Sequence, residues 1–171
     1  MSFFRGFKYA FCGIIHCIKN ERNMRIHTVA ATYVLIFARF FALTREDYIL
    51  LLLTIGGVIS AEAVNTAIEN LCDKVSPNYH TLIKHAKDAA AGAVLILAIF
   101  AVIIGIILFS NFDGLCALYN FYITHPLNLC AIIALTVIST IYIIFEPSKI
   151  KKFFLGIFSK KHTEETSNDK H

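Results

Sequence analysis

Charged residues are scarce in this chain. Asp, Glu, Lys and Arg make up only 16% of its 171 residues, and 57% of the residues are apolar. Soluble globular domains average about 25% charged and about 45–50% apolar residues. The mean hydropathy of +0.64 departs from a soluble protein in the same direction. The composition therefore excludes an ordinary soluble domain and predicts an integral membrane protein.

Several familiar signatures are also missing. The five cysteines form no C-x-x-C pair, and their odd number gives no indication of a disulfide framework. The chain contains no GxxxxGKS or GxxxxGKT segment and no GxGxxG segment. A phosphate-binding loop of the Walker type or of the protein-kinase type is therefore excluded, and no nucleic-acid partner is expected.

Long apolar segments are what the chain has instead. A transmembrane helix needs about 20 mostly apolar residues. Four segments meet this requirement approximately, at residues 26–43, 48–67, 89–112 and 127–145. They predict an all-α integral membrane protein with four transmembrane helices and short connections.

Lys and Arg are distributed unevenly around these four spans. Fourteen of the sixteen lie before the first span, between the second and the third, or after the fourth. The other two, Arg39 and Arg45, lie at the far end of the first span. Cytoplasmic loops carry the excess of positive charge in membrane proteins. We therefore expect a multi-pass protein of the plasma membrane with both termini in the cytoplasm, as an even number of spans requires.

The segment before the first span, residues 1–25, has a different pattern. Apolar side chains recur there at helical spacing, and basic residues lie between them. The apolar positions are Phe3, Phe4, Phe7, Phe11, Ile14, Ile15 and Ile18. This pattern predicts an N-terminal amphipathic helix on the membrane surface. A helix packed on a partner subunit is the alternative.

The second span carries an unusual polar face. Glu62, Asn65, Glu69 and Asp73 follow one another at offsets of i, i+3, i+7 and i+11, which places them on one side of an α-helix. An ionisable residue at membrane depth costs about 2.5–3.5 kcal/mol on insertion scales. Since crossing a membrane does not require this cost, the stripe predicts a functional site. Carboxylates can bind a divalent cation such as Mg²⁺ or transfer a proton.

Two further polar groups flank this face at the same membrane surface. The segment NERNMRIH, residues 20–27, leads into the first span, and Lys84, Lys87 and Asp88 lie at the start of the third. Together these groups would suit phosphoryl transfer from a metal-bound nucleotide to a hydroxyl group at the interface. Spacing alone leaves a carboxylate-dependent ion transporter equally open. A non-catalytic subunit that recruits partners through a basic tail is a third possibility.

Four sequence blocks narrow this choice. EAVNTAIENLCDK, NYH and KHAKDAAAGAVL, together with NERNMRIH upstream, closely resemble the prokaryotic diacylglycerol kinase family. The resemblance covers about residues 3–110. Among the branches of the family, NERNMRIH looks most like the undecaprenol kinases of Gram-positive bacteria. The branch implies undecaprenol as the acceptor, and diacylglycerol is the alternative.

The resemblance also implies an assembly, a cofactor and roles for individual residues. Members of the family are homotrimers with three spans per subunit and sites shared between subunits, and they use MgATP. Glu62 matches the general base, and Asn65 matches an essential polar residue of the catalytic site. Glu21 and Glu69 match the ligands of Mg²⁺ on the nucleotide. The matched nucleotide-binding positions are Tyr9, Glu21, Glu69, Asn78, Tyr79, His80, Lys87 and Asp88.

The chain departs from the family pattern at its C-terminal end. We expect a surface helix at residues 1–25, a three-span lipid kinase core at 26–112, an outer loop and an extra transmembrane helix at 113–147, and a basic cytoplasmic tail at 148–171. The added span contains no charged residue, so we assign it no chemistry. It is expected to pack on the periphery of the trimer.

Overall fold

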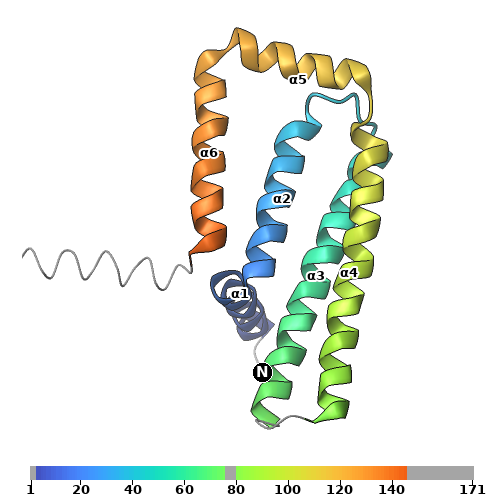
Figure 1. The fold of residues 1–171 in the computed structure, drawn as a ribbon, viewed down its shortest axis with the longest axis vertical. Helices are drawn as coiled ribbons and strands as arrows, with labels where there is room; N and C mark the ends of the chain where they lie inside the picture. The colour runs from blue at the N-terminus through green and yellow to red at the C-terminus, as the bar shows by residue number, and fades with distance from the viewer. Residues whose placement is uncertain (1–2, 76–79, 146–171) are drawn as a thin grey trace, which may run out of the picture.

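The computed structural model describes residues 3–75 and 80–145, and its regular structure in these ranges is entirely helical (Figure 1). The helices are α1 (Phe3–Asn20), α2 (Arg22–Ala38), α3 (Arg45–Val75), α4 (Thr81–Phe109), α5 (Phe112–Thr124) and α6 (Pro126–Ile144). The all-α prediction is confirmed. The predicted basic tail, residues 148–171, lies outside the described residues.

Three of these helices, α3, α4 and α6, are long and apolar enough to cross a membrane within the described part of the chain. At 1.5 Å per residue, the 31 residues of α3 extend over about 46 Å. This is longer than the hydrocarbon core of about 30 Å. The polar end of α3 can therefore extend out of the apolar layer while the rest of the helix crosses it.

Helix α2 is shorter than the first predicted span. Its 17 residues extend over about 25 Å, and it ends at Ala38 although apolar residues continue to Leu43. The reason lies at the start of α3. There the backbone N–H of Thr44 donates to the Asp47 carboxylate at 2.9 Å, and the N–H of Asp47 donates to Thr44 Oγ1 at 3.3 Å. Reciprocal bonds of this kind fix a helix N-terminus, and residues 39–44 before it are not helical. A complete first crossing stays a prediction.

The connection between the third and fourth predicted spans contains a helix, α5, which the sequence did not predict. Asn111 caps α5, because its side chain accepts a hydrogen bond from the backbone N–H of Asp113 at 2.9 Å. Such a cap satisfies one of the free N–H groups at a helix start. Helix α5 crosses the end of the bundle from α4 to α6 (Figure 1).

Gly114 lets α5 approach the α2–α3 turn closely. A Cβ atom at this position would lie 2.3 Å from Cδ1 of Phe41, and Phe41 is itself buried against Phe109 in an edge-on contact. We expect Gly114→Ala to lower the free energy of unfolding by about 1–3 kcal/mol, the usual cost of overpacking. Thermal unfolding in detergent measures this effect. Gly6→Ala is the control, since a Cβ there would meet no atom within 4 Å, and an equal effect of both variants would contradict the packing argument.

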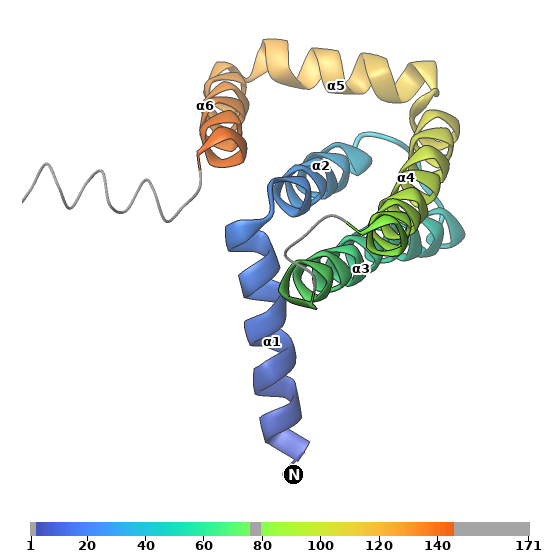
Figure 2. The same ribbon diagram turned by 60° about the horizontal axis from the view of Figure 1, so that its bottom comes forward.

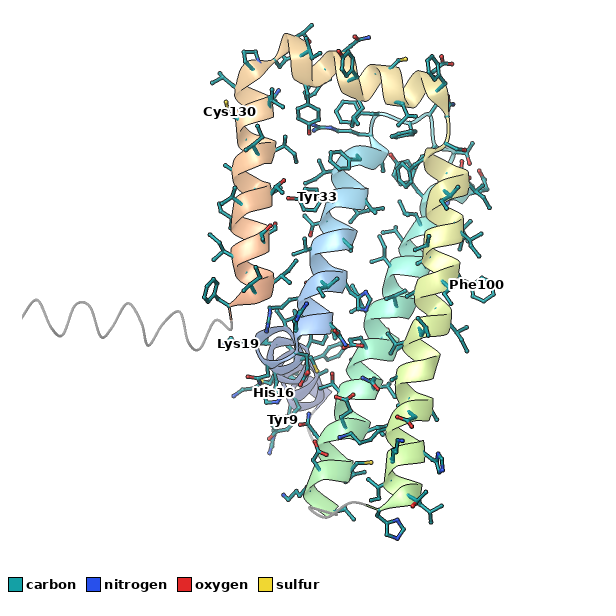
Figure 3. The ribbon with its side chains drawn as sticks, viewed as in Figure 1. Tyr9, His16, Lys19, Tyr33, Phe100 and Cys130 are labelled. Atoms are coloured by element: carbon teal, nitrogen blue, oxygen red, sulfur yellow. The ribbon has the colours of Figure 1, made fainter. Side chains whose placement is uncertain are left out.

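Helix α6 runs back along α2 (Figures 1 and 3). The Tyr33 hydroxyl donates to Thr136 Oγ1 at 3.0 Å. The buried Arg25 guanidinium donates to the carbonyl oxygens of Lys19 at 3.1 Å and of Ile143 at 3.5 Å. A cation at the carboxyl ends of two helices, α1 and α6, is favourable because the last carbonyls lack partners within the helix. The added helix is thus attached to α2, and none of its residues is buried in the single chain.

Helix α1 projects away from the bundle across its axis (Figure 2). It ends at Asn20, and Glu21, in extended conformation with φ −100° and ψ 124°, separates it from α2. Large apolar side chains on α1 are exposed, among them Phe11, which is 63% exposed. An exposed apolar face next to basic residues fits the predicted surface helix.

Candidate active site

The predicted polar face of α3 points into the bundle. Glu62 and Asn65 are buried, at 2% and 4% exposure, and Glu69 is half-buried. Val64 and Leu71, on other sides of the helix, are 59% and 63% exposed. This distribution is the reverse of that in a soluble protein, where apolar residues fill the interior. It confirms that the carboxylates and the amide share one face.

Side chains on this face are only partly satisfied by hydrogen bonds. The Asn65 amide donates to Glu69 Oε1 at 3.1 Å. Glu62 Oε2, Asn65 Oδ1 and the hydroxyl oxygen of the buried Thr66 have no hydrogen-bond partner among the described residues. A buried polar group without a partner costs about 1–3 kcal/mol. Three such atoms within five residues of one helix indicate a place where a polar ligand binds.

Glu62 and Asn65 border a groove of about 270 Å³ between α2, α3 and α4, here called the polar groove. Its polar lining consists of Asn23, His27, Glu62, Asn65 and Glu69. Helix α4 contributes only apolar side chains, among them Val94. A concave site with a few convergent polar groups in an apolar wall is the usual form of a small-molecule site.

Two residues of the polar groove were missed from the sequence. Asn23 and His27 lie one turn apart on α2 and face the groove, and the Asn23 amide is close enough to the Glu62 carboxylate to stabilise its charge. Their i, i+4 spacing within NERNMRIH was the available signal. It was not decisive, because many exposed helices carry two polar residues at this spacing.

Glu21 approaches the groove from the α1–α2 junction. It precedes α2 and its side chain makes no capping hydrogen bond, so the carboxylate is available for other partners. Burial raises the pKa of the neighbouring Cys17 thiol, and the negative charge of Glu21 adds to the rise. The carboxylates of Glu21 and Glu69 both lie within electrostatic reach of Glu62. Three negative charges thus converge, two from α3 and one from the α1–α2 junction.

The carboxylates fit a magnesium site that a substrate completes. No three His, Cys, Asp or Glu side chains in residues 3–75 and 80–145 come together closely enough to hold a metal ion by themselves. Mg²⁺ is commonly bound through one or two carboxylates together with substrate phosphates and water. The available Glu21 carboxylate and the half-buried Glu69 match this requirement, whereas a complete protein cage is not present among the described residues.

The other predicted nucleotide-binding residues lie outside the polar groove of the single chain. Lys87 forms an ion pair with Asp73 across the α3–α4 hairpin, with Nζ 2.7 Å from Oδ1. Asp88 and His80 are exposed, and His80 precedes α4. Tyr9 is 57% exposed on α1, away from the bundle (Figure 3). The last two predicted positions, Asn78 and Tyr79, lie outside the described residues.

A family model described as prokaryotic diacylglycerol kinase matches residues 8–109 of the chain. The matched stretch contains every residue that lines the polar groove. The chain belongs to the prokaryotic diacylglycerol kinase family. It is therefore a lipid kinase. The match ends where α4 ends, so α5 and α6 are additions to the part that the family shares.

Curated members of the family include relatives with two different names. The chain is 42% identical over 107 residues to an undecaprenol kinase of Bacillus subtilis, which covers 63% of this chain and 87% of the relative. It is 43% identical over 101 residues to a diacylglycerol kinase of Synechocystis, covering 58% of each protein. It is 33% identical over 105 residues to a diacylglycerol kinase of Escherichia coli, covering 61% of this chain and 86% of that one. The family resemblance predicted from the sequence blocks is confirmed.

Proposed function

We propose that the protein transfers the γ-phosphoryl group of ATP to the hydroxyl group of undecaprenol and releases undecaprenyl phosphate and ADP. The observation that supports this most directly is Glu62. Its carboxylate is 2% exposed, and its Oε2 atom has no hydrogen-bond partner among the described residues. Glu62 borders the polar groove and lies on α3, a helix long enough to cross a membrane. At this depth, only an alcohol that is itself held in the membrane meets the carboxylate at a fixed position.

Glu62 acts as the general base in this proposal. Its free Oε2 accepts the proton of the lipid hydroxyl. The lipid oxygen then forms a bond to the γ-phosphorus as the bond to the β–γ bridging oxygen breaks, and ADP leaves. The transition state of phosphoryl transfer is loose, so position and charge neutralisation contribute more than covalent chemistry. Asn65 orients the Glu69 carboxylate through its hydrogen bond.

Glu21 and Glu69 would hold Mg²⁺ together with the ATP phosphates. The bound ion supplies the positive charge that neutralises the phosphate oxygens during transfer. Without it, three convergent carboxylates would repel a triphosphate. Lys87 and Asp88 lie on α4, at the same end of the bundle. We assign Lys87 to the nucleotide phosphates and Asp88 to their positioning.

The active site faces the cytoplasm in this proposal. The polar ends of α3 and α4 lie at the end of the bundle where α1 crosses it (Figure 1). That end collects the positive charges that mark the cytoplasmic side. Helix α1 then lies on the inner leaflet, α2, α3, α4 and α6 cross the plasma membrane, and the enzyme assembles as a homotrimer with sites shared between subunits.

A comparison of acceptors tests the proposed function. Purified enzyme in detergent micelles is incubated with labelled ATP and either undecaprenol or diacylglycerol. We expect undecaprenol to be the better acceptor. A higher kcat/KM for diacylglycerol would assign the enzyme to the other named activity of its relatives. Ion flux through liposomes without ATP consumption would instead favour a transporter.

Removal of α5 and α6 tests whether the added helices belong to the catalytic unit. We expect a chain that ends at Asn111 to phosphorylate lipid, because the shared family region ends at residue 109. It should be less stable, since the bonds from Tyr33 and Arg25 to α6 are worth about 1 kcal/mol each. Lipid phosphorylation and thermal unfolding in detergent measure the two effects. A folded but inactive truncation would place part of residues 112–171 in the catalytic machinery.

A further inference from the structure

A second groove continues the polar groove along the same three helices. It has a volume of about 110 Å³ and is here called the apolar groove. His27 lines both grooves and is their common residue. On α2, the lining runs from Asn23 and His27 in the polar groove to Val34 in the apolar groove. The two grooves therefore meet at His27.

The lining residues on α3 and α4 show the same path from the polar groove to the apolar groove. On α3, the polar groove is lined from Glu62 onward and the apolar groove by residues from Leu51 to Ile59. On α4, Val94 lines the polar groove and Gly105 the apolar one. The stretch from Leu51 to Ile59 extends over about 12 Å of helix. A chain attached to a hydroxyl group at Glu62 would therefore continue from the polar groove along this path, away from the end where α1 lies.

The apolar groove offers few polar partners. His27 and Thr54 are its only lining residues with polar side chains. The Thr54 hydroxyl donates to the carbonyl oxygen of Leu50 at 2.7 Å, so its proton is already used. His27 makes no side-chain hydrogen bond to another described residue. The imidazole is thus the one side chain lining the apolar groove with a free hydrogen-bond donor.

We infer that the apolar groove binds a single hydrocarbon chain without ester groups, and that His27 holds the acceptor hydroxyl at the junction by donating one ring N–H to its oxygen. This inference rests on the proposed function and extends it to the choice of acceptor. In a polyprenol, only carbon and hydrogen follow the hydroxyl-bearing carbon. In a diacylglycerol, the next carbon carries an ester oxygen, and its carbonyl would enter the apolar groove without a partner.

Size supports one chain. Small side chains at Ala30, Ala31, Ala101 and Gly105 open the apolar groove, and larger residues such as Leu51 and Val58 close its sides. A diacylglycerol would have to leave its second chain outside or widen the space between the helices. The free Oε2 of Glu62, which is buried beside the junction, then meets the hydroxyl that His27 holds.

Steady-state kinetics with two detergent-soluble acceptors, farnesol and 1,2-dioctanoylglycerol, test this inference. We expect the unmodified enzyme to have a kcat/KM at least about tenfold higher for farnesol, since the cost of one unpaired polar group corresponds to a factor of about 5–150. Ala31→Phe and the milder Ala31→Leu should raise the KM for farnesol about tenfold or more and leave the KM for ATP unchanged. Ala134→Phe, an exposed position on α6, is the matched control.

His27 is tested separately. His27→Ala should raise the KM for farnesol and leave the KM for ATP unchanged, and His27→Gln, which keeps a donor, should recover part of the loss. Equal kcat/KM values for the two acceptors, or folded Ala31 and His27 variants with an unchanged KM for farnesol, would overturn the inference while the lipid kinase stands. An unmodified enzyme that phosphorylates neither lipid would overturn the proposed function as well.

Discussion

Glu62→Gln should lower the turnover of lipid phosphorylation by about 10²–10⁴-fold, the usual contribution of a general base. Glutamine has the same shape as the buried glutamate but cannot accept the proton of the lipid hydroxyl. Binding of ATP should persist, because Glu21 and Glu69 are unchanged. The measurement is kcat with saturating ATP and undecaprenol in detergent micelles, together with a separate assay of nucleotide binding.

The stability of this variant separates a chemical role from a structural one. Glu62 lies within electrostatic reach of Glu69 and Glu21, so its replacement by a neutral amide removes repulsion between like charges. We expect thermal unfolding of Glu62→Gln at the same temperature as the unmodified enzyme or above it. Glu46→Gln, at the exposed first turn of the same helix, is the matched control and should keep full activity. Near-normal turnover of Glu62→Gln would remove Glu62 as the base.

The sequence predicted the candidate site best where helix spacing and the energetic cost of burying polar residues in a membrane pointed to the same residues. Glu62, Asn65 and Glu69 had to share a helix face by their periodicity, and the cost of burying them in a membrane indicated a function. The structure places all three in one groove. It adds that Asp73, the last residue of the stripe, pairs with Lys87 across the hairpin. That pairing depends on the packing of α3 against α4, which helix spacing does not contain.

The structure differs from the sequence-based prediction where local hydrogen bonds and packing contacts, which hydropathy does not describe, decide where a helix begins or ends. Apolar residues continue beyond Ala38, so the predicted first span extends past the end of α2, and the hydrogen bonds between Thr44 and Asp47 mark the start of α3. The connection from residue 113 to the fourth span was expected as a loop. The Asn111 cap and the contact of Gly114 with Phe41 favour a helix instead. His27 was missed because its importance depends on two grooves formed by three helices.

Glu69→Gln should raise the Mg²⁺ concentration needed for half-maximal activity by at least about tenfold. Replacing even a residue that only supports a metal ligand can lower the metal affinity by this factor. The physical reason is the loss of one of two carboxylates at a site that the ATP phosphates complete. Glutamine keeps an oxygen that can accept the hydrogen bond from Asn65, which the unmodified enzyme makes at 3.1 Å. The buried face of α3 should therefore stay in place, and excess Mg²⁺ should restore most of the turnover.

Asp73→Asn provides the comparison for this prediction. It makes the same carboxylate-to-amide change one turn further along the stripe, at an exposed residue paired with Lys87. Since an exposed ion pair contributes at most about 1 kcal/mol, its loss should leave the Mg²⁺ requirement unchanged. Mg²⁺ titrations at fixed ATP, with both variants beside the unmodified enzyme, measure the difference. If Glu69→Gln and Asp73→Asn shift the titration equally, the ion is held by the overall negative charge of the helix end, and Glu69 is not its ligand.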